Sequence, residues 1–420
     1  RDARSAPEMN DQPESAGPRV VVAGGGVAGL EALLALDDLA GDRSALTLVA
    51  PRPDFLYKPL LVAEPFDLGP AERHELAPLA EAKGARFAER AVRAVRPDDH
   101  LVELDDGSTL EYDYLVVCTG GRFKPALEGA ATFPSGGEPF RVDQVLDRAE
   151  GKHRRLAFVV PFGISWSLPL YELALMTQRR AGERGAAVEI AIVTPESAPL
   201  ALFGPVASAA VAALLEARGI EFFASSTVRE IDETGIALSP RNRALGPAEA
   251  VALPVMEGPA IDGLPADEKG FVPIDEHARV KGIDDVYAAG DATNFPIKQG
   301  GLGTQQADAA AQHIAHRLGA TGVPEPFRPI LCGKLLTGDE SLNLRAYVAG
   351  GGGEGEASPD ALWWPPHKIS ARYLAPLLYH GDAHAEPEPP RRSLDIEVAF
   401  PREWHQEPIA LDPYEPRDVG

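Results

Sequence analysis

The chain has 420 residues, of which 45% are hydrophobic, and a formal net charge of -23. This length predicts two or three domains, and the acidic balance argues against binding to nucleic acid phosphates. Its two cysteines, Cys118 and Cys332, form no CxxC pair, which excludes a local redox disulfide. No run of 18 apolar residues predicts a membrane-spanning helix, and the polar residues 1–17 predict a disordered terminus and no signal peptide.

The first predicted βαβ unit contains a glycine-rich loop. An apolar strand at 19–23 leads into Gly24-Gly25-Gly26-Val27-Ala28-Gly29, followed by a helix at 27–40 and a strand at 45–50. In such loops the first glycine makes the turn, the second admits a pyrophosphate, and the third lets the helix pack against the strand. The helix N-terminus then faces the anion. The loop therefore predicts a dinucleotide site, the alternative being a glycine-rich turn of any α/β protein.

Further elements follow in chain order. Residues 85–116 alternate in polarity and predict short antiparallel strands that turn at Asp105-Asp106-Gly107, and a strand at 114–118 ends in Thr119-Gly120. A second α/β unit is predicted from strands at 156–160, 188–193, 220–224 and 251–255, with helices at 167–181 and 204–218. A long alanine-rich helix is expected at 303–318.

The loop of the second unit departs from the first. Aligned on the glycines, Pro161 replaces the first glycine and Trp166 replaces the third. Proline has no N–H and fixes φ, and an indole fills space that the third glycine keeps empty. The contrast predicts a tightly held flavin dinucleotide in the first unit and a damaged nicotinamide site in the second. The alternative for Trp166 is a core aromatic residue in a vestigial domain.

Three separated segments together resemble the FAD domain of the two-dinucleotide-binding-domain flavoproteins. They are the glycine loop, the strand that ends in Cys118-Thr119-Gly120, and the run 286–291 that ends in Gly290-Asp291. The resemblance implies bound FAD, with Asp291 bonded to the ribityl chain. Ala50 stands where an acid usually ends the second strand, so Arg52 is a candidate contact for adenosine or pyrophosphate. The alternative for Arg52 is a surface arginine in a turn.

Two other segments are similar to type II NADH dehydrogenases and sulfide:quinone oxidoreductases. Phe55-Leu56-Tyr57-Lys58-Pro59-Leu60-Leu61 looks like their flavin-facing segment, and 296–307 also resembles them. The resemblance implies that the N–H groups of Gly301 and Leu302 face the flavin pyrimidine ring, where Lys298 would stabilise negative charge on reduced flavin. Gln305 and Gln306 are candidates to bond a quinone carbonyl, and Lys298 and Gln305 are the predicted catalytic residues. A solvated lysine and a capping or surface glutamine are the alternatives.

The same resemblance has limits. Trp166 falls where sulfide:quinone oxidoreductases carry an essential cysteine, so the likeness does not extend to sulfide oxidation. Residues 362–380 combine tryptophan, tyrosine and lysine, which fits peripheral contact with a membrane. A buried plug or a homodimer contact is the alternative for that segment.

We expect an α/β fold with two Rossmann-like domains and a C-terminal segment at 326–420, whose part from 383 onwards is extended or partly disordered. The FAD domain, at 18–150 and 256–325, is split by a degenerate NAD-binding-like domain at 151–255. No metal site is predicted.

The expected function is that of a cytoplasmic, peripherally membrane-bound or free, FAD-dependent oxidoreductase. It passes electrons from a small-molecule donor to a quinone-like acceptor. Two alternatives remain: an NAD(P)H:acceptor oxidoreductase with an atypical nicotinamide site, and a flavin-bound interaction module with little turnover.

Overall fold

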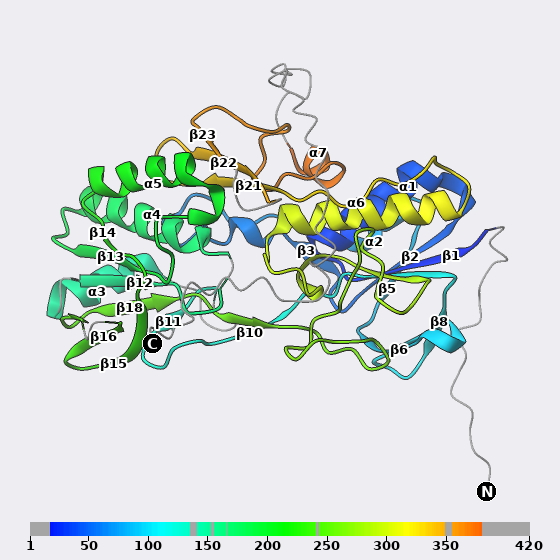
Figure 1. Ribbon diagram of the computed structural model, residues 1–420, viewed down its shortest axis with the longest axis horizontal. Helices are drawn as coiled ribbons and strands as arrows, with labels where there is room; N and C mark the ends of the chain where they lie inside the picture. The colour runs from blue at the N-terminus through cyan, green and yellow to red at the C-terminus, as the bar shows by residue number, and fades with distance from the viewer. Residues whose placement is uncertain are drawn as a thin grey trace, which may run out of the picture.

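The structure is a computed structural model that describes residues 17–134, 141–152, 155–164, 166–240, 243–348 and 355–379. Residues 1–16 of the tail predicted at 1–17, and the tail predicted from 383 onwards, lie outside the described residues. Two five-stranded sheets occupy opposite ends of the molecule (Figure 1). A small C-terminal sheet lies near the middle, against helices of both ends (Figure 1).

The first sheet has the order β20-β9-β1-β2-β5, and every pairing in it is parallel. Its strands are β1 (Arg19–Ala23), β2 (Ala45–Ala50), β5 (Arg86–Glu89), β9 (Tyr114–Val117) and β20 (Val286–Ala288). Helices α1 (Val27–Ala40) and α6 (Gly300–Arg317) cover one face. Because both faces are covered, the central strands are apolar throughout and not alternating.

A three-stranded antiparallel sheet closes the other face of the first sheet. It consists of β6 (Val92–Arg96), β7 (Leu101–Leu104) and β8 (Thr109–Glu111), with the predicted turn between β7 and β8. The expectation that all of 85–116 is antiparallel is wrong at its ends, because β5 and β9 pair in parallel with β2 and β1. Short apolar runs have the same pattern in either kind of sheet.

The second sheet has the order β11-β18-β12-β13-β14, again wholly parallel. Its strands are β11 (Ala131–Thr132), β12 (Arg155–Val159), β13 (Glu189–Val193), β14 (Glu221–Phe223) and β18 (Glu249–Ala252). One face packs on α3 (Val142–Lys152), α4 (Leu168–Arg184) and α5 (Pro205–Ala217). The other face packs on the antiparallel β15 (Thr227–Asp232), β16 (Gly235–Ser239) and β17 (Ala244–Leu245).

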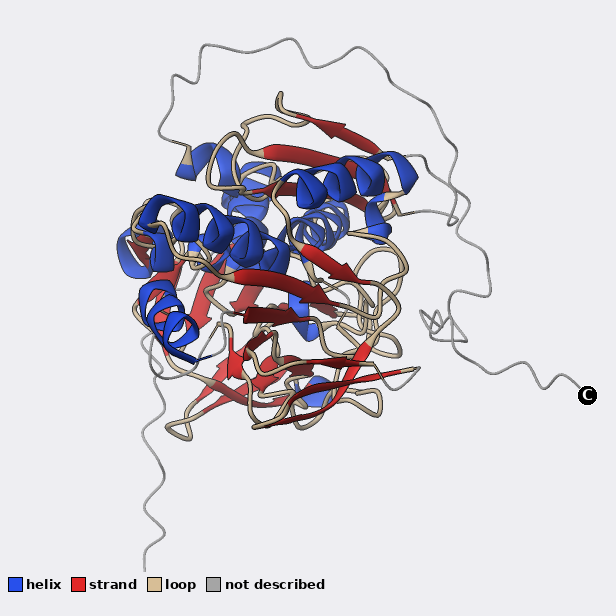
Figure 2. Cartoon of the chain, turned by 90° about the vertical axis from the view of Figure 1, so that its left-hand side faces the viewer, coloured by secondary structure: helices blue, strands red, loops and turns tan. Residues whose placement is uncertain are grey.

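Two short strands carry the chain between the sheets. β10 (Arg122–Lys124) leaves the first unit, β19 (Val255–Glu257) returns to it, and the two pair antiparallel. Strand β20 then joins the first sheet beside β9. The predicted α/β class, with one Rossmann-like unit split around another, is confirmed, while the exact domain limits stay predictions. The layers of helix and sheet are visible in the turned view (Figure 2).

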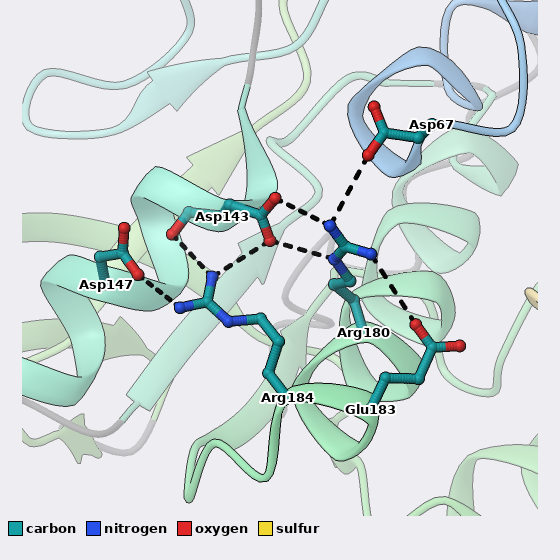
Figure 3. Close-up of polar contacts among 6 residues, drawn as sticks. All are labelled: Asp67, Asp143, Asp147, Arg180, Glu183 and Arg184. Carbon is teal, nitrogen blue, oxygen red and sulfur yellow. Dashed lines mark hydrogen bonds and ion pairs between the residues drawn. The ribbon is translucent and has the colours of Figure 1, made fainter.

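An ion network on the surface holds α3 against α4 (Figure 3). Arg180 binds both carboxylate oxygens of Asp143, at 3.0 and 2.9 Å, and lies 3.6 Å from Asp67. Arg184 lies 3.1 Å from Asp143 and also binds Asp147. These side chains are partly exposed, so each pair contributes at most about 1 kcal/mol.

The C-terminal segment packs on both units. Strands β21 (Ile330–Leu335), β22 (Leu342–Tyr347) and β23 (Glu356–Ser358) form the small sheet, which contacts α4, α5 and α6. Helix α7 (Leu374–Leu378) lies on α1. None of the helices in the described parts of the chain combines the length and hydropathy needed to cross a bilayer.

A buried glutamate fastens α7 to the first unit. Glu31 of α1 is fully buried and accepts the N–H groups of Arg372, Tyr373 and Leu374 at 2.7, 2.9 and 2.6 Å. Burial raises the pKa of Glu31, and the three backbone donors oppose that rise. The carboxylate satisfies N–H groups at the start of α7 that would otherwise lack partners.

Replacing Glu31 by alanine removes these three bonds together. We expect Glu31→Ala to lower the free energy of unfolding by about 3 kcal/mol, because buried backbone donors lose a charged acceptor. Urea unfolding of the purified protein measures the change. Asp37→Ala on the same helix, where the carboxylate pairs with Lys83 at 3.1 Å near the surface, serves as the control and should cost about 0.5 kcal/mol or less. Equal losses in both variants would contradict this role of Glu31.

Candidate functional site

A cavity of about 2660 Å³ extends from the glycine loop of the first unit to the loop that follows β12. Segments from both units and from the C-terminal part line it. The predicted site residues among them are Gly24, Gly26, Val27, Ala28, Ala50, Arg52, Lys58, Pro59, Thr119, Gly120, Gly290, Asp291 and Lys298. Tertiary structure thus brings together four motifs that are up to about 270 residues apart.

The first, second and third glycines of the dinucleotide pattern are Gly24, Gly26 and Gly29, and each has a different environment. Gly24 has φ +130°, and a Cβ built on it would lie 2.1 Å from the carbonyl oxygen of Cys118. A Cβ on Gly29 would lie 1.7 Å from the carbonyl oxygen of Gly24, whereas one on Gly26 would meet nothing within 4 Å. These are the turn, the close helix packing and the open approach expected of a dinucleotide loop.

Helix α1 presents its N-terminus to this open space. Gly26 is its N-cap residue, no side chain caps the helix, and Val27 and Ala28 line the cavity. The first-turn N–H groups of a helix have no partner within the helix, and the dipole places positive charge there. Residues of this kind fit the pyrophosphate of a dinucleotide.

Close backbone contacts place Asp291 beside α1. A Cβ on Gly290, which has φ +75°, would lie 3.0 Å from the Cβ of Ala28. A Cβ on Gly303 of α6 would lie 3.0 Å from the Cα of Gly290. Gln306, on α6, accepts the N–H of Gly290 at 2.8 Å. Gln306 was expected, with Gln305, to bond a quinone carbonyl, and its bond to the Gly290 N–H follows only from the packing of α6 on the loop.

Lys298 and Asp291 are half-buried in the same part of the cavity wall. Burial lowers the pKa of Lys298 to about 8, although Asp291 and Asp267 oppose the shift. Burial raises the pKa of Asp291, and Lys298 and Lys58 oppose that rise. The ammonium of Lys298 donates to the carbonyl of Thr293 and lies 3.7 Å from the centre of the Phe271 ring. The alternative of a solvated lysine therefore does not describe this environment.

Gly29, Gly301, Leu302 and Gln305 do not line the cavity. The side-chain amide of Gln305 donates to the carbonyls of Gly301 and Ile330, both at 2.8 Å, and accepts the Ile330 N–H at 2.9 Å. The N–H of Leu302 donates to Gln299 Oε1 at 2.8 Å. Gln305 thus joins α6 to β21, and Gly300 stands at the cavity where Gly301 and Leu302 were expected.

The loop of the second unit lines the far part of the cavity. Trp166 is half-buried, and its ring centre lies 5.8 Å from that of Phe203. Pro161 is buried, while Phe162 is 63% exposed. The packing of Trp166 agrees with the aromatic-core alternative, and its indole nevertheless forms part of the cavity wall.

A buried ion pair that the sequence analysis missed also lines the cavity. The side chains of Glu172 and Lys368 are 1% and 8% exposed and bind each other. Glu172 Oε1 accepts the N–H of Leu336 at 2.8 Å, and Lys368 donates to the carbonyl of Lys334 at 2.6 Å. Burial raises the pKa of Glu172 and lowers the pKa of Lys368. In the sequence, the isolated acid Glu172 within the apolar run of α4 could have indicated a buried charge that needs a partner.

One oxygen of this pair is left for other contacts. Glu172 Oε2 is buried and has no hydrogen-bond partner among the described residues. An unpaired buried oxygen is costly unless a ligand or a proton satisfies it. The cavity wall therefore holds a group that can bind or exchange a proton.

The described part of the segment predicted to touch a membrane packs on the protein body. Lys368 is buried against Glu172, and Trp363 donates its indole N–H to the carbonyl of His367 at 3.1 Å. Ile369 and Leu378 are buried beside α1. These contacts agree with the plug alternative, and membrane contact through 362–380 stays a prediction.

Comparison with known proteins agrees with this architecture. The model of the pyridine nucleotide-disulphide oxidoreductase family matches residues 18–313. The chain belongs to this family. The resemblance inferred from the motifs is therefore confirmed at the level of the family, and the protein is an oxidoreductase.

Relatives and a solved structure extend the comparison. The chain is 26% identical, over 83% of its length and 75% of the relative, to an alternative NAD(P)H-ubiquinone oxidoreductase of Arabidopsis thaliana. It is 28% identical, over 82% of its length and 89% of the relative, to a demethylphylloquinone reductase of Synechocystis. The fold is similar to that of the sulfide:quinone oxidoreductase of Aquifex aeolicus, with a TM-score of 0.72 at 22% identity over 79% of this chain and 84% of that one.

The open space beside Gly26 leads to a prediction about cofactor binding. Gly26→Ala should fold normally, since its φ of -91° suits alanine and its Cβ meets no protein atom. The new methyl group would enter the space through which a pyrophosphate approaches, so we expect FAD affinity to fall about tenfold. Flavin fluorescence titration of the FAD-depleted protein measures it. Gly182→Ala, in α4 and also free of clashes, is the matched control and should keep wild-type affinity.

Proposed function

We propose that the chain is an FAD-dependent oxidoreductase that passes electrons to a quinone-like acceptor. The observation that carries the proposal is the open glycine cradle at the N-terminus of α1, which continues into the cavity wall formed by Asp291 and Lys298. The relatives include an NAD(P)H-ubiquinone oxidoreductase and a demethylphylloquinone reductase, which supports the acceptor class.

The chain's own residues suit this role. Gly26 leaves room for a pyrophosphate, Gly24 and Gly29 allow the turn and the close helix packing beside it, and Arg52 is an exposed cation at the same end of the cavity. Thr119 and Gly120 complete the wall there, and bound FAD would supply the two-electron chemistry. Asp291 would accept hydroxyl hydrogen bonds, and Lys298 would place positive charge beside the cofactor.

The acceptor would occupy the part of the cavity near the start of α6. Gly300, Ile369 and Phe327 line it, together with Glu172 and Lys368. Reduction of a quinone consumes protons, and Glu172 Oε2 is a buried oxygen without a partner that can bind one at the cavity wall. Peripheral membrane contact through 362–380, a cytoplasmic location and a homodimer are further parts of this proposal.

A second candidate donor is favoured by one relative's name. The relative from Arabidopsis is called an NAD(P)H-ubiquinone oxidoreductase, so oxidation of NAD(P)H by an altered binding pose is the alternative. Pro161 and Trp166 argue against it, because they stand where a nicotinamide dinucleotide needs a free N–H and an empty space.

Anaerobic spectroscopy of the purified protein tests the proposed function. We expect a bound-flavin spectrum that persists through gel filtration and slow or absent bleaching by NADH or NADPH. Sulfide should also bleach it slowly, since a tryptophan occupies the position of the family's cysteine. Prompt bleaching by NADH would select the alternative donor. A colourless protein that does not take up FAD would overturn the proposal.

Lys298 provides a test of charge near the cofactor. We expect Lys298→Met to lower the reduction potential of bound FAD by on the order of 30 mV, which is about 1.4 kcal/mol for two electrons. Loss of the cation makes negative charge on the reduced flavin less stable. Dye-linked potentiometric titration measures the shift. Lys269→Met, at an exposed position on the same cavity, is the control and should leave the potential nearly unchanged.

A further inference from the structure

Phe271 lies against the ammonium group of Lys298. The ammonium lies over the Phe271 ring, 3.7 Å from its centre, and donates to the carbonyl of Thr293. Phe271 is buried, Lys298 is half-buried, and both line the cavity. A cation over the face of an aromatic ring is attracted by the negative charge of that face, and the attraction grows as water is removed. The ring is therefore a partner of the ammonium, as the carbonyl is.

The backbone places these two partners side by side. The loop before Phe271 closes on itself, because Asp267 Oδ1 accepts the Phe271 N–H at 2.9 Å and the Asp267 N–H donates to the Phe271 carbonyl at 2.8 Å. The next residue, Val272, pairs in parallel with Thr293. The ring and the carbonyl that bind Lys298 thus come from paired segments, so backbone hydrogen bonds set the distance between them.

The charges that face Lys298 make its protonation sensitive to small contacts. Burial lowers the pKa of Lys298 to about 8, Asp291 and Asp267 oppose that shift, and Lys269 adds to it. Lys58 in turn acts on Asp291. Because the ammonium begins to lose its proton near neutral pH, any group that favours the charged form has a measurable effect.

An aromatic ring differs from a carboxylate in its effect on the surrounding field. A carboxylate favours the ammonium but cancels its charge, so the pair presents little net charge to a ligand. A ring has no net charge, so it favours the ammonium and leaves the positive charge uncancelled. Phe271 therefore has an effect that Asp291 and Asp267 cannot have.

We propose that Phe271 is a positioning residue for the reaction. Its ring holds Lys298 as a cation at the cavity wall, where the uncancelled charge stabilises negative charge on a reduced cofactor. The contact between ring and ammonium belongs to the chain itself, whereas the benefit to a cofactor rests on the proposed function. The two parts are therefore tested separately.

Competitive acetylation tests the first part. Acetic anhydride modifies only the neutral amine, so the labelling rate of Lys298 between about pH 6 and pH 10 reports what fraction of the amine carries a proton. Peptide mass spectrometry of the purified full-length protein gives this rate relative to Lys269, an exposed lysine on the same cavity. Neither turnover nor bound FAD is required.

Removing the ring should let Lys298 lose its proton about one pH unit earlier. We expect Phe271→Leu to be labelled at least about threefold faster than wild type at about pH 7, and within about twofold of wild type at about pH 10, where the amine is neutral in both. Phe271→Tyr keeps the ring and should reproduce the wild-type profile. Unchanged labelling in Phe271→Leu would overturn the inference. So would an equal increase at both pH values, because it reports looser packing and not charge.

A second replacement keeps the size of the side chain. Pentafluorophenylalanine in place of Phe271 has nearly the same shape but reverses the charge distribution of the ring, so it should shift the labelling profile as leucine does. It decides the first part even where Phe271→Leu fails to fold. A wild-type profile in this protein would contradict the role of the ring.

Potentiometric titration of the FAD-loaded protein tests the second part. At about pH 8, Phe271→Leu should weaken the preference for reduced flavin about threefold, which is about 15 mV for a two-electron couple, and Phe271→Tyr should not. A shifted labelling profile with an unchanged potential would overturn the role toward the cofactor. A protein that binds no FAD would instead overturn the proposed function, and labelling would still decide whether the ring holds Lys298 as a cation.

Discussion

Backbone lies directly against backbone at the centre of the first unit, and the cofactor cradle depends on this contact. A side chain on Gly24 would collide with the carbonyl of Cys118, and one on Gly29 would collide with the carbonyl of Gly24. Gly290 and Gly303 repeat the same close approach between the following loop and α6. Because these contacts set how near α1 and α6 come to the strand ends, they also set the width of the cavity.

Two buried glutamates and one half-buried glutamate organise the parts of the chain around that centre. Glu31 holds the start of α7, Glu172 binds Lys368 and the backbone of β21, and Glu196 joins α4 to the end of β13. A buried carboxylate without partners is very unfavourable, so each one specifies the segment that satisfies it. The C-terminal segment is thereby tied to both units.

Local sequence patterns predicted most of the elements, since apolar periodicity and turn residues act over short distances. Helix α1 and strands β1 and β2 agree with their predicted ranges, and the predicted 204–218 helix is α5 at Pro205–Ala217. The predictions were wrong where the structure depends on tertiary partners. Strand β5 pairs in a parallel sheet, and the side chain of Gln305 bonds to the backbone of β21 and does not line the cavity. A side chain with both donors and an acceptor takes whichever partner the packing brings nearest.

The sequence by itself determined the two Rossmann-like units, their order, and the contrast between Gly24-to-Gly29 and Pro161-to-Trp166, because backbone conformation and side-chain volume are properties of single residues. Only the tertiary structure decided which groups meet in the cavity. The Glu172–Lys368 pair spans 196 residues, and the contact of Glu31 with α7 spans more than 300. Such pairings depend on which faces the packed helices turn toward one another, and no local pattern encodes that choice.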